Sequence, residues 1–222
     1  MPLPPEIFTI VRDYLSLRDI SSLILTCHEV NRWVDMNDVI REYYLVNKGY
    51  SLVYDSCRDG HINLLMYLHH IGIDISHNEV VIAVCQGHLH IVQYLHSIGT
   101  NLSVRFNDPM LLASNNGHLS IVQYLYSIGK DPTLNNNEAI KFASLGGHLP
   151  TVEYLHSVGA DPTAGNNTPI IWASKGGHLH VVRYLHSVGA DPTDFNNAAI
   201  KIASNNGHDD IVEYLRANGA SL

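Results

Sequence analysis

The sequence is poor in cysteine, and it has no long apolar run. Three of its 222 residues are cysteines, an odd number, and their spacing is not that of a metal site. We expect Cys27, Cys57 and Cys85 to be reduced, small buried residues in a cytoplasmic or nuclear protein. No apolar run approaches the roughly 18 residues of a membrane-spanning helix. The start of the chain also lacks the basic segment of a signal peptide.

Basic residues are scarce as well. Lys and Arg total 13 against 21 Asp and Glu, so the formal net charge is -8 at pH 7. An acidic balance disfavours general binding to nucleic acid and adhesion to an anionic membrane surface. The composition therefore predicts protein partners, with no nucleic acid and no membrane.

Repetition is what the sequence has in abundance. Gly-His occurs six times, and each pair is followed, after a short apolar stretch, by Tyr-Leu. The spacing of the glycines is constant except for a shorter first interval: they are Gly60, Gly87, Gly117, Gly147, Gly177 and Gly207. A fixed period of about 30 residues indicates one supersecondary unit stacked on copies of itself. Such an array offers a long binding surface rather than a catalytic pocket.

The repeat from Asp161 to Ala190 serves as the example. Asp161-Pro162-Thr163 predicts an extended turn, because proline restricts its own φ and that of its predecessor. Asn166-Asn167 predicts a further turn. Thr168-Pro169 predicts the start of a short helix, with the threonine hydroxyl as its cap. Gly176-Gly177 is then expected to end that helix.

A second helix is expected after His178. Its apolar residues recur three and four positions apart, which places them on one stripe of a helix. Gly189 is expected to end it in a left-handed cap. The stripe consists of Leu179, Val181, Val182, Leu185 and Val188.

These motifs resemble the ankyrin repeat. Thr168-Pro169-Ile170-Ile171-Trp172-Ala173-Ser174 is similar to its Thr-Pro-Leu-His-x-Ala-Ala signature, and Gly177-His178-Leu179 and Gly189-Ala190-Asp191 match its other marks. The resemblance implies an all-α solenoid of six helix-turn-helix units, repeating with the period of the Gly-His pairs. It covers residues 50–222, with units at about 50–72, 73–99, 100–129, 130–159, 160–189 and 190–222.

The repeat departs from the family in two ways. It is shorter than the family unit, which usually has about 33 residues. The missing residues fall in the hairpin before the first helix. The signature histidine is also replaced, by Leu111, Lys141, Ile171 and Lys201. The shortened unit with Asn-Asn and Tyr-Leu resembles the ankyrin arrays of giant amoeba-infecting DNA viruses.

The first 45 residues do not follow the repeat and resemble an F-box. The likeness rests on Leu3-Pro4-x-Glu6-Ile7, Leu17-x-Asp19-Ile20 and Trp33. It implies a helical segment that docks on the small linker subunit of a cullin–RING ubiquitin ligase. Plain capping helices at the end of the array are the alternative reading. The resemblance implies linker contacts through Leu3, Pro4, Pro5, Ile7, Ile10, Leu15, Leu17 and Leu23.

Fifteen histidines raise the question of a metal site. The Gly-His histidines are expected to bond backbone between repeats, and those in the column of His69, His96, His156 and His186 lie too far apart to share one ion. We therefore predict no metal, no cofactor and no catalytic residues, and no enzyme activity. The histidine content also predicts that stability or partner binding falls below pH about 6.5.

A partner is expected to bind where the repeats differ from one another. In the resembling family these hairpin and first-helix positions line the concave face. Phe195 is the most suggestive, because an aromatic residue at a loop tip is a common anchor, although it could instead pack on the next hairpin. We interpret the column of Leu112, Phe142, Trp172 and Ile202 as core. The expected target contacts are Asn115, Asn116, Leu134, Asn135, Glu138, Lys175, Asp194, Phe195, Asn205 and Asn206.

Two functions follow from these expectations. The first is a monomeric adaptor, whose F-box-like segment binds the ligase linker while the array recruits a target protein. That target is a host protein in the host cytoplasm if the likeness to viral arrays holds. The second is a non-catalytic scaffold or sequestering binder with no ubiquitin role.

Overall fold

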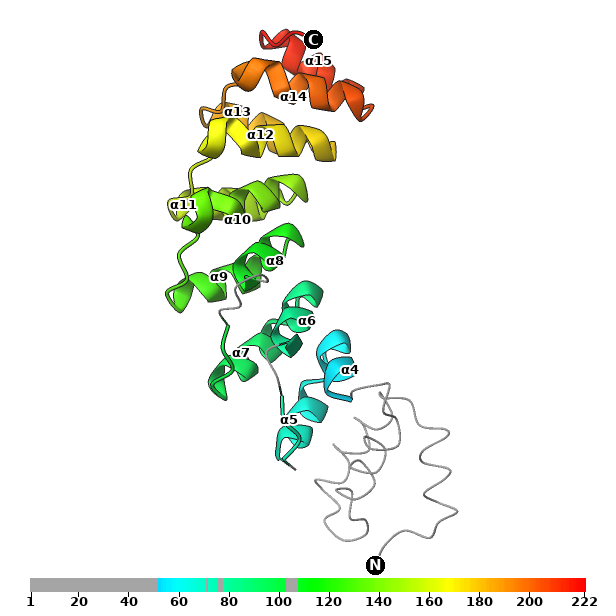
Figure 1. Cartoon of the computed structure of the whole chain (residues 1–222), viewed down its shortest axis with the longest axis vertical. Helices are drawn as coiled ribbons and strands as arrows, with labels where there is room; N and C mark the ends of the chain where they lie inside the picture. Colours follow the sequence, from blue (N-terminus) through cyan, green and yellow to red (C-terminus); the bar gives the residue numbers. More distant parts are fainter. Residues whose placement is uncertain (1–51, 71, 76–77, 103–107) are drawn as a thin grey trace, which may run out of the picture. The chain divides into compact units, whose positions relative to one another are not determined.

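The computed structural model describes residues 52–70, 72–75, 78–102 and 108–222 (Figure 1). These described residues form twelve α-helices and no strand, as the all-α solenoid predicts. The F-box-like segment expected at residues 1–45 lies outside them. The helices are α4 (Leu52–Asp59), α5 (Ile62–His70), α6 (Asn78–Gln86), α7 (Leu89–Ser97), α8 (Pro109–Asn115), α9 (Leu119–Ser127), α10 (Leu134–Leu145), α11 (Leu149–Ser157), α12 (Ala164–Gly176), α13 (Leu179–Ser187), α14 (Asp194–Asn205) and α15 (Asp209–Ala217).

The chain divides into two units, residues 1–102 and 103–222. In both units the two helices of a repeat pack against one another to form a pair, such as α4 with α5 or α10 with α11. Within the second unit the pairs stack in order. Its first helices α8, α10, α12 and α14 contact one another in sequence, and so do its second helices α9, α11, α13 and α15 (Figure 1).

The second helix of each pair buries one apolar stripe. In α13, Val181, Val182 and Leu185 are fully buried, while Leu179 and Val188 at the edges of the stripe are half-buried. Each fully buried side chain of this size contributes about 1.5–3 kcal/mol through the water it excludes. The spacing in the sequence predicted this stripe, and the described second helices all repeat it.

The Gly-His pair joins the two helices of a repeat and also meets the next repeat. Gly147 has a φ of +76°, which only glycine adopts without cost. A Cβ added to Gly147 would lie 2.4 Å from the His178 ring of the following repeat. Glycine is therefore required here for two reasons, the left-handed backbone and the close approach of the histidine.

A turn of left-handed helix lies within the first residues of three of the first helices, α10, α12 and α14. Asn135, Asn136 and Asn137 have φ values of +54°, +60° and +59°. The backbone N–H of Asn137 donates to the Thr133 carbonyl oxygen at 3.0 Å and closes the turn. Three consecutive left-handed residues are unusual for L-amino acids, and asparagine is one of the few types that enter this region readily. We call these segments the αL turns: residues 135–137, 165–167 and 195–197.

The αL turns confirm one expectation about the start of the first helix and correct another. The asparagines do form a turn, but that turn is a left-handed helical one over three residues. The Thr168 hydroxyl does not cap the helix; it donates to the Gly165 carbonyl oxygen inside the αL turn. A side-chain cap of the expected kind is present in α8, where Asp108 accepts from the Met110 backbone N–H at 2.8 Å.

The last helix, α15, carries Asp209 and Asp210 in its first turn and Arg216 in its last turn. Opposite charges at these ends complement the helix dipole. Its inner stripe is still buried, with Ile211 and Leu215 fully covered. Among the described residues, no helix is long and apolar enough to cross a membrane.

Candidate protein-binding face

The turn that opens a repeat is held by its own aspartate. Oδ1 of Asp161 accepts hydrogen bonds from the backbone N–H and the hydroxyl of Thr163, both at 2.8 Å. The backbone N–H of Asp161 donates to Asn137 Oδ1, in the αL turn before it, at 2.9 Å. The aspartate turn and the αL turn before it therefore stabilise the fold of the array. The same contacts recur one repeat later between Asp191, Thr193 and Asn167.

The Gly-His histidines join one repeat to the repeat before it, as the sequence predicted. Nε2 of His178 lies 2.9 Å from the Leu145 carbonyl oxygen. A carbonyl only accepts, so this nitrogen carries the proton. Burial lowers the pKa of His178, and the nearby histidines add to that effect. The equivalent contacts are made by His88, His148 and His208.

A second histidine column has a structural role that the sequence did not predict. Nδ1 of His156 lies 2.8 Å from the Tyr184 hydroxyl oxygen of the next repeat, with the two rings edge-on. This tyrosine of a Tyr-Leu pair therefore ties neighbouring second helices together. The other such pairs are His69 with Tyr94 and His186 with Tyr214.

We searched the described part of the chain for groups that could hold a metal ion or act as a thiolate. No three histidine, cysteine or carboxylate side chains there are placed to hold a metal ion. Cys57 and Cys85 are free thiols. Burial raises the pKa of Cys57 to about 12 and also raises that of Cys85. Neither thiol is therefore a ready nucleophile at neutral pH.

The residues expected to contact a target lie in two rows in the second unit. One row is at the αL turns, where the first helices begin; the other is where the same helices end. The right-handed part of α10 runs from Glu138 to Leu145, so about 12 Å separates the rows. The structure thus places these residues along one set of helices but does not gather them in one pocket. The turn row holds Leu134, Asn135, Glu138, Asp194 and Phe195, and the end row holds Asn115, Asn116, Lys175, Asn205 and Asn206.

The turn row contains the two most exposed apolar side chains of the first helices. Phe195 is 62% exposed and Leu134 is 54% exposed. Phe195 also has a φ of +49°, which is an outlier for a bulky residue. Asp194 accepts from the Phe195 backbone N–H at 2.7 Å and from Asn167 Nδ2 at 2.7 Å. Phe195 is therefore held outward by its neighbours and does not pack away from water.

Several residues of the end row have local hydrogen bonds. Nδ2 of Asn116 donates to the Leu112 carbonyl oxygen at 2.8 Å, and Nδ2 of Asn206 donates to Ile202 in the same way at 2.7 Å. These amides satisfy carbonyl groups that the helix end leaves open. Lys175 is exposed, and its carbonyl oxygen accepts from His208.

An aromatic pair lies between the two rows. The rings of Phe142 and Trp172 meet edge-on, with 5.3 Å between their centroids. The sequence favours core for this column, but Leu112, Phe142, Trp172 and Ile202 are only half-buried. Phe142 and Trp172 cover one another in part, and all four side chains remain partly open to solvent. The first helices of the second unit thus present a half-exposed apolar stripe.

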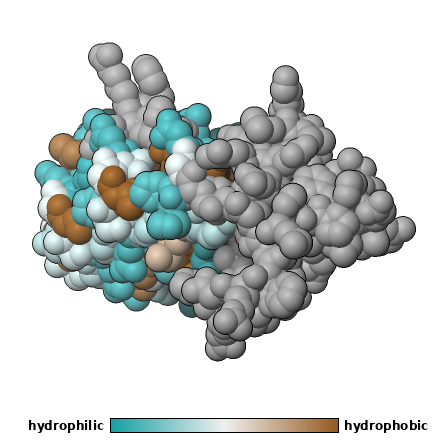
Figure 2. All heavy atoms as spheres, turned by 90° about the horizontal axis from the view of Figure 1, so that it is seen from below, coloured by the Kyte–Doolittle hydropathy of each residue, from teal (hydrophilic) through white to brown (hydrophobic). Residues whose placement is uncertain are grey.

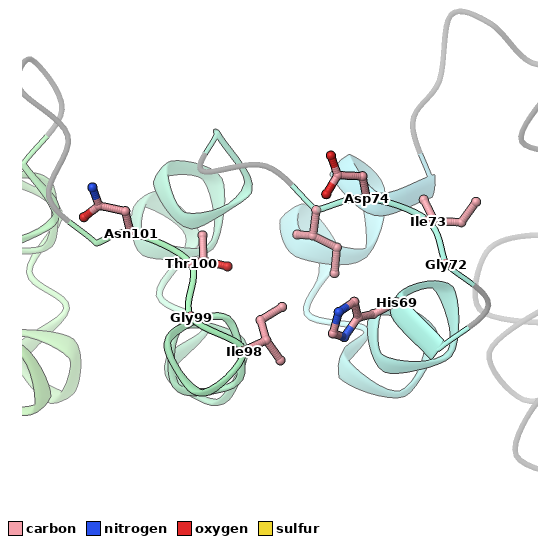
Figure 3. A pocket seen from close by; sticks show the side chains of 9 residues that line it. His69, Gly72, Ile73, Asp74, Ile98, Gly99, Thr100 and Asn101 are labelled. Carbon is pink, nitrogen blue, oxygen red and sulfur yellow. The ribbon is translucent and has the colours of Figure 1, made fainter.

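The first unit has a shallow pocket of about 550 Å³ between the loops that follow α5 and α7 (Figure 3). His69 and Ile98 face one another across it, and Asp74 and Asn101 lie at its rim. None of the expected target contacts lies there. Because His69 is bonded to Tyr94, it belongs to the connection between repeats.

Elsewhere the apolar surface is dispersed. On the face shown in Figure 2, hydrophobic residues of the described part stand singly among hydrophilic ones. Scattered apolar residues of this kind are normal on a monomer. The residues expected to contact a ligase linker, Leu3 to Leu23, lie outside the described residues.

The fold and the repeated contacts define a helical repeat protein. The family model for ankyrin repeats matches residues 52–136, 80–166 and 140–222. The chain therefore belongs to the ankyrin-repeat family, as the sequence motifs predicted. A search of curated proteins found no match.

Proposed function

We propose that this protein binds a protein partner through the first helices and αL turns of its second unit. Ankyrin arrays are scaffolds for protein–protein interaction, and the family membership supports this role. One observation carries the choice of face. The Phe142–Trp172 pair and Phe195 leave aromatic surface open on these elements.

Aromatic side chains suit this role because they bury a large area and lose little conformational freedom. The second helices are poorer candidates. Their outward positions carry isolated polar residues such as Gln123 and Glu153, and their tyrosines bond to histidines of the neighbouring repeat. The binding face is therefore the one formed by α8, α10, α12 and α14.

The experiment compares two variants of the full chain by proximity labelling in expressing cells. Trp172→Ala with Phe195→Ala should lose the proteins that wild type labels, whereas Gln123→Ala with Glu153→Ala should keep them. Far-UV circular dichroism and urea unfolding must show that both variants are folded. Equal labelling by wild type and both variants contradicts the assignment of this face.

The finer proposal is an adaptor role. The F-box-like residues of the first 45 positions support it, because that motif docks on the linker subunit of cullin–RING ligases. The array would then raise the effective concentration of its target at the ligase. The similarity to viral arrays favours a host target, met in the cytoplasm or the nucleus. The alternative is a scaffold or sequestering binder in which residues 1–49 only cover the array.

Purified linker subunit separates these two readings. Wild-type chain should capture it, and Leu3→Ala with Pro4→Ala should abolish capture without loss of the repeats. A matched pair on the repeats, Gln123→Ala with Glu153→Ala, should capture normally. If wild type captures none, the adaptor reading fails while the binding role of the repeats stands.

A further inference from the structure

Lys141 has an unusual environment for a lysine. It occupies the signature-histidine position on α10, and its side chain is 7% exposed. Among the described residues, no hydrogen bond or ion pair to its ammonium is found. Lys201 occupies the same position two repeats later, but it is exposed and donates to the Asn196 carbonyl oxygen at 2.6 Å. The two lysines are therefore equivalent in the repeat and different in their surroundings.

The difference arises from the next repeat. A Cβ added to Gly165, in the αL turn at the start of α12, would lie 3.2 Å from Lys141 Nζ and 3.4 Å from Asn136 Nδ2. The Thr168 hydroxyl oxygen would be 3.1 Å away, and its proton is already donated to the Gly165 carbonyl. The ammonium of Lys141 and the amide of Asn136 therefore both lie close to Gly165, where any larger residue would press its side chain against them.

The other repeats carry a larger residue at the position of Gly165. The residues equivalent to Gly165 are Asn135 and Phe195, and the residues that precede them in the position of Lys141 are Leu111 and Ile171. Where the signature-histidine position holds an apolar residue, the αL turn of the next repeat begins with asparagine or phenylalanine. Where it holds Lys141, that turn begins with glycine. This pairing occurs once in the described array, between α10 and α12. We call the space between Lys141, Asn136 and Gly165 the Lys141 notch.

Charge and size select the occupant. One ammonium balances one negative charge, and a carboxylate offers two oxygens to two donors. A phosphate carries close to two charges at neutral pH and fits less well. The aromatic pair Phe142–Trp172 lies on the same two helices and offers apolar contact nearby.

We propose that the Lys141 notch receives a carboxylate from the protein partner, an acidic side chain that is followed or preceded by an apolar one. The proposal rests on the binding role of this face and adds to it the chemistry of the partner. A charge-assisted hydrogen bond is about twice as strong as a neutral one, so loss of the carboxylate should weaken binding at least about ten-fold.

Random linear peptides displayed on phage and panned against the full chain provide the probe. The selected peptides should share an acidic residue near Leu, Ile, Phe or Trp. Replacing that acid by its amide should weaken binding to wild type at least about ten-fold in fluorescence anisotropy. Lys141→Met should bind the acidic peptide more weakly than wild type by the same factor, and it should bind the amide peptide with the affinity of wild type. Lys201→Met, the matched control, should behave as wild type with both.

Folding of these variants is expected because the repeats themselves contain the replacements. Apolar residues occupy the Lys141 position at Leu111 and Ile171. A second variant, Gly165→Asn, copies Asn135, whose φ of +54° is close to the +64° of Gly165. Its side chain should fill the notch and weaken binding of the acidic peptide at least about ten-fold. This test remains available if Lys141→Met does not fold.

Three results overturn the proposal. The first is a selection without acidic residues, and the second is an acid-to-amide loss that persists in Lys141→Met. The third is tighter binding of a peptide with phosphoserine in place of the acid. If peptides without acids still lose affinity in Trp172→Ala with Phe195→Ala, the binding face stands and only the notch fails. A panning that enriches no peptide above bare support counts against both.

Discussion

His178 reaches back across the repeat boundary, and its Nε2 lies 2.9 Å from the carbonyl oxygen of Leu145. That oxygen belongs to the end of α10, where the helix has no N–H of its own to offer. The histidine therefore performs two tasks, since it satisfies a helix end and it fixes the distance between repeats. Its ring also occupies the space above Gly147, so the contact depends on a residue without a side chain.

The first prediction concerns pH. Burial lowers the pKa of His178 below the ordinary value of 6.5, so the unfolded chain takes up a proton there at higher pH than the folded chain. The contribution of this residue is complete above pH 6.5 and declines as the pH falls from there toward the folded pKa. We expect the melting temperature to fall between pH 7.5 and 5.5.

His178→Gln supplies the control for this titration. Glutamine can still donate toward the Leu145 carbonyl but does not titrate, so the variant should show a smaller fall over the same range. A melting temperature that is flat in wild type, or equally steep in both proteins, contradicts the assignment to His178.

The second prediction tests the need for glycine beside that histidine. Gly147→Ala should lower the free energy of unfolding by about 2–3 kcal/mol, because alanine disfavours φ of +76° and its Cβ displaces the His178 ring. Gly129→Ala has φ of +89° and no atom within 4 Å of the new Cβ. It should cost only about 1 kcal/mol. Equal costs in urea unfolding would show that the close approach contributes nothing.

The third prediction addresses the αL turn of α12. Asn167 is 8% exposed; its Oδ1 accepts from the Asp191 N–H at 3.0 Å and its Nδ2 donates to Asp194 at 2.7 Å. Asn167→Ala removes both contacts, so we expect a loss of about 2–4 kcal/mol in urea unfolding. Asn166 has nearly the same φ but is exposed, and Asn166→Ala should cost about 1 kcal/mol or less. A larger loss at Asn166 than at Asn167 refutes the anchoring role.

The regular parts of the fold could be predicted because they depend on local pattern. The stripe of Val181, Val182 and Leu185 follows from spacing alone, and Gly177 marks a helix end by its chemistry. The αL turns could be predicted only in part. An Asn-Asn pair indicates left-handed backbone, but nothing local to Phe195 shows that it shares the same conformation. Its φ is set by the fold around it.

The candidate site was harder to predict, since it depends on which residues of different repeats meet. Phe142 and Trp172 were predicted to be core because both are large and apolar, yet both are only half-buried. Lys141 stood out only as a departure from the family signature. Its significance comes from Gly165 in the following repeat, and aligning the repeats on one another is the sequence signal that links the two.

The last prediction concerns the strained aromatic residue of the turn row. Phe195→Asn places at φ of +49° the residue type that Asn135 supplies in an equivalent position. Asparagine tolerates this backbone better than phenylalanine, and little packing is lost because Phe195 is 62% exposed. We therefore expect the variant to be about 0.5–1 kcal/mol more stable in urea unfolding and to bind the selected peptides more weakly.

Leu134→Asn is the matched control, because Leu134 is 54% exposed but does not have a positive φ. It should leave stability within about 0.5 kcal/mol of wild type while also weakening binding. Gain of stability with loss of binding at Phe195 alone would mean that the chain keeps an unfavourable conformation for the sake of its partner. If Phe195→Asn is less stable than wild type, the phenylalanine serves packing, and the anchor moves to the Phe142–Trp172 pair.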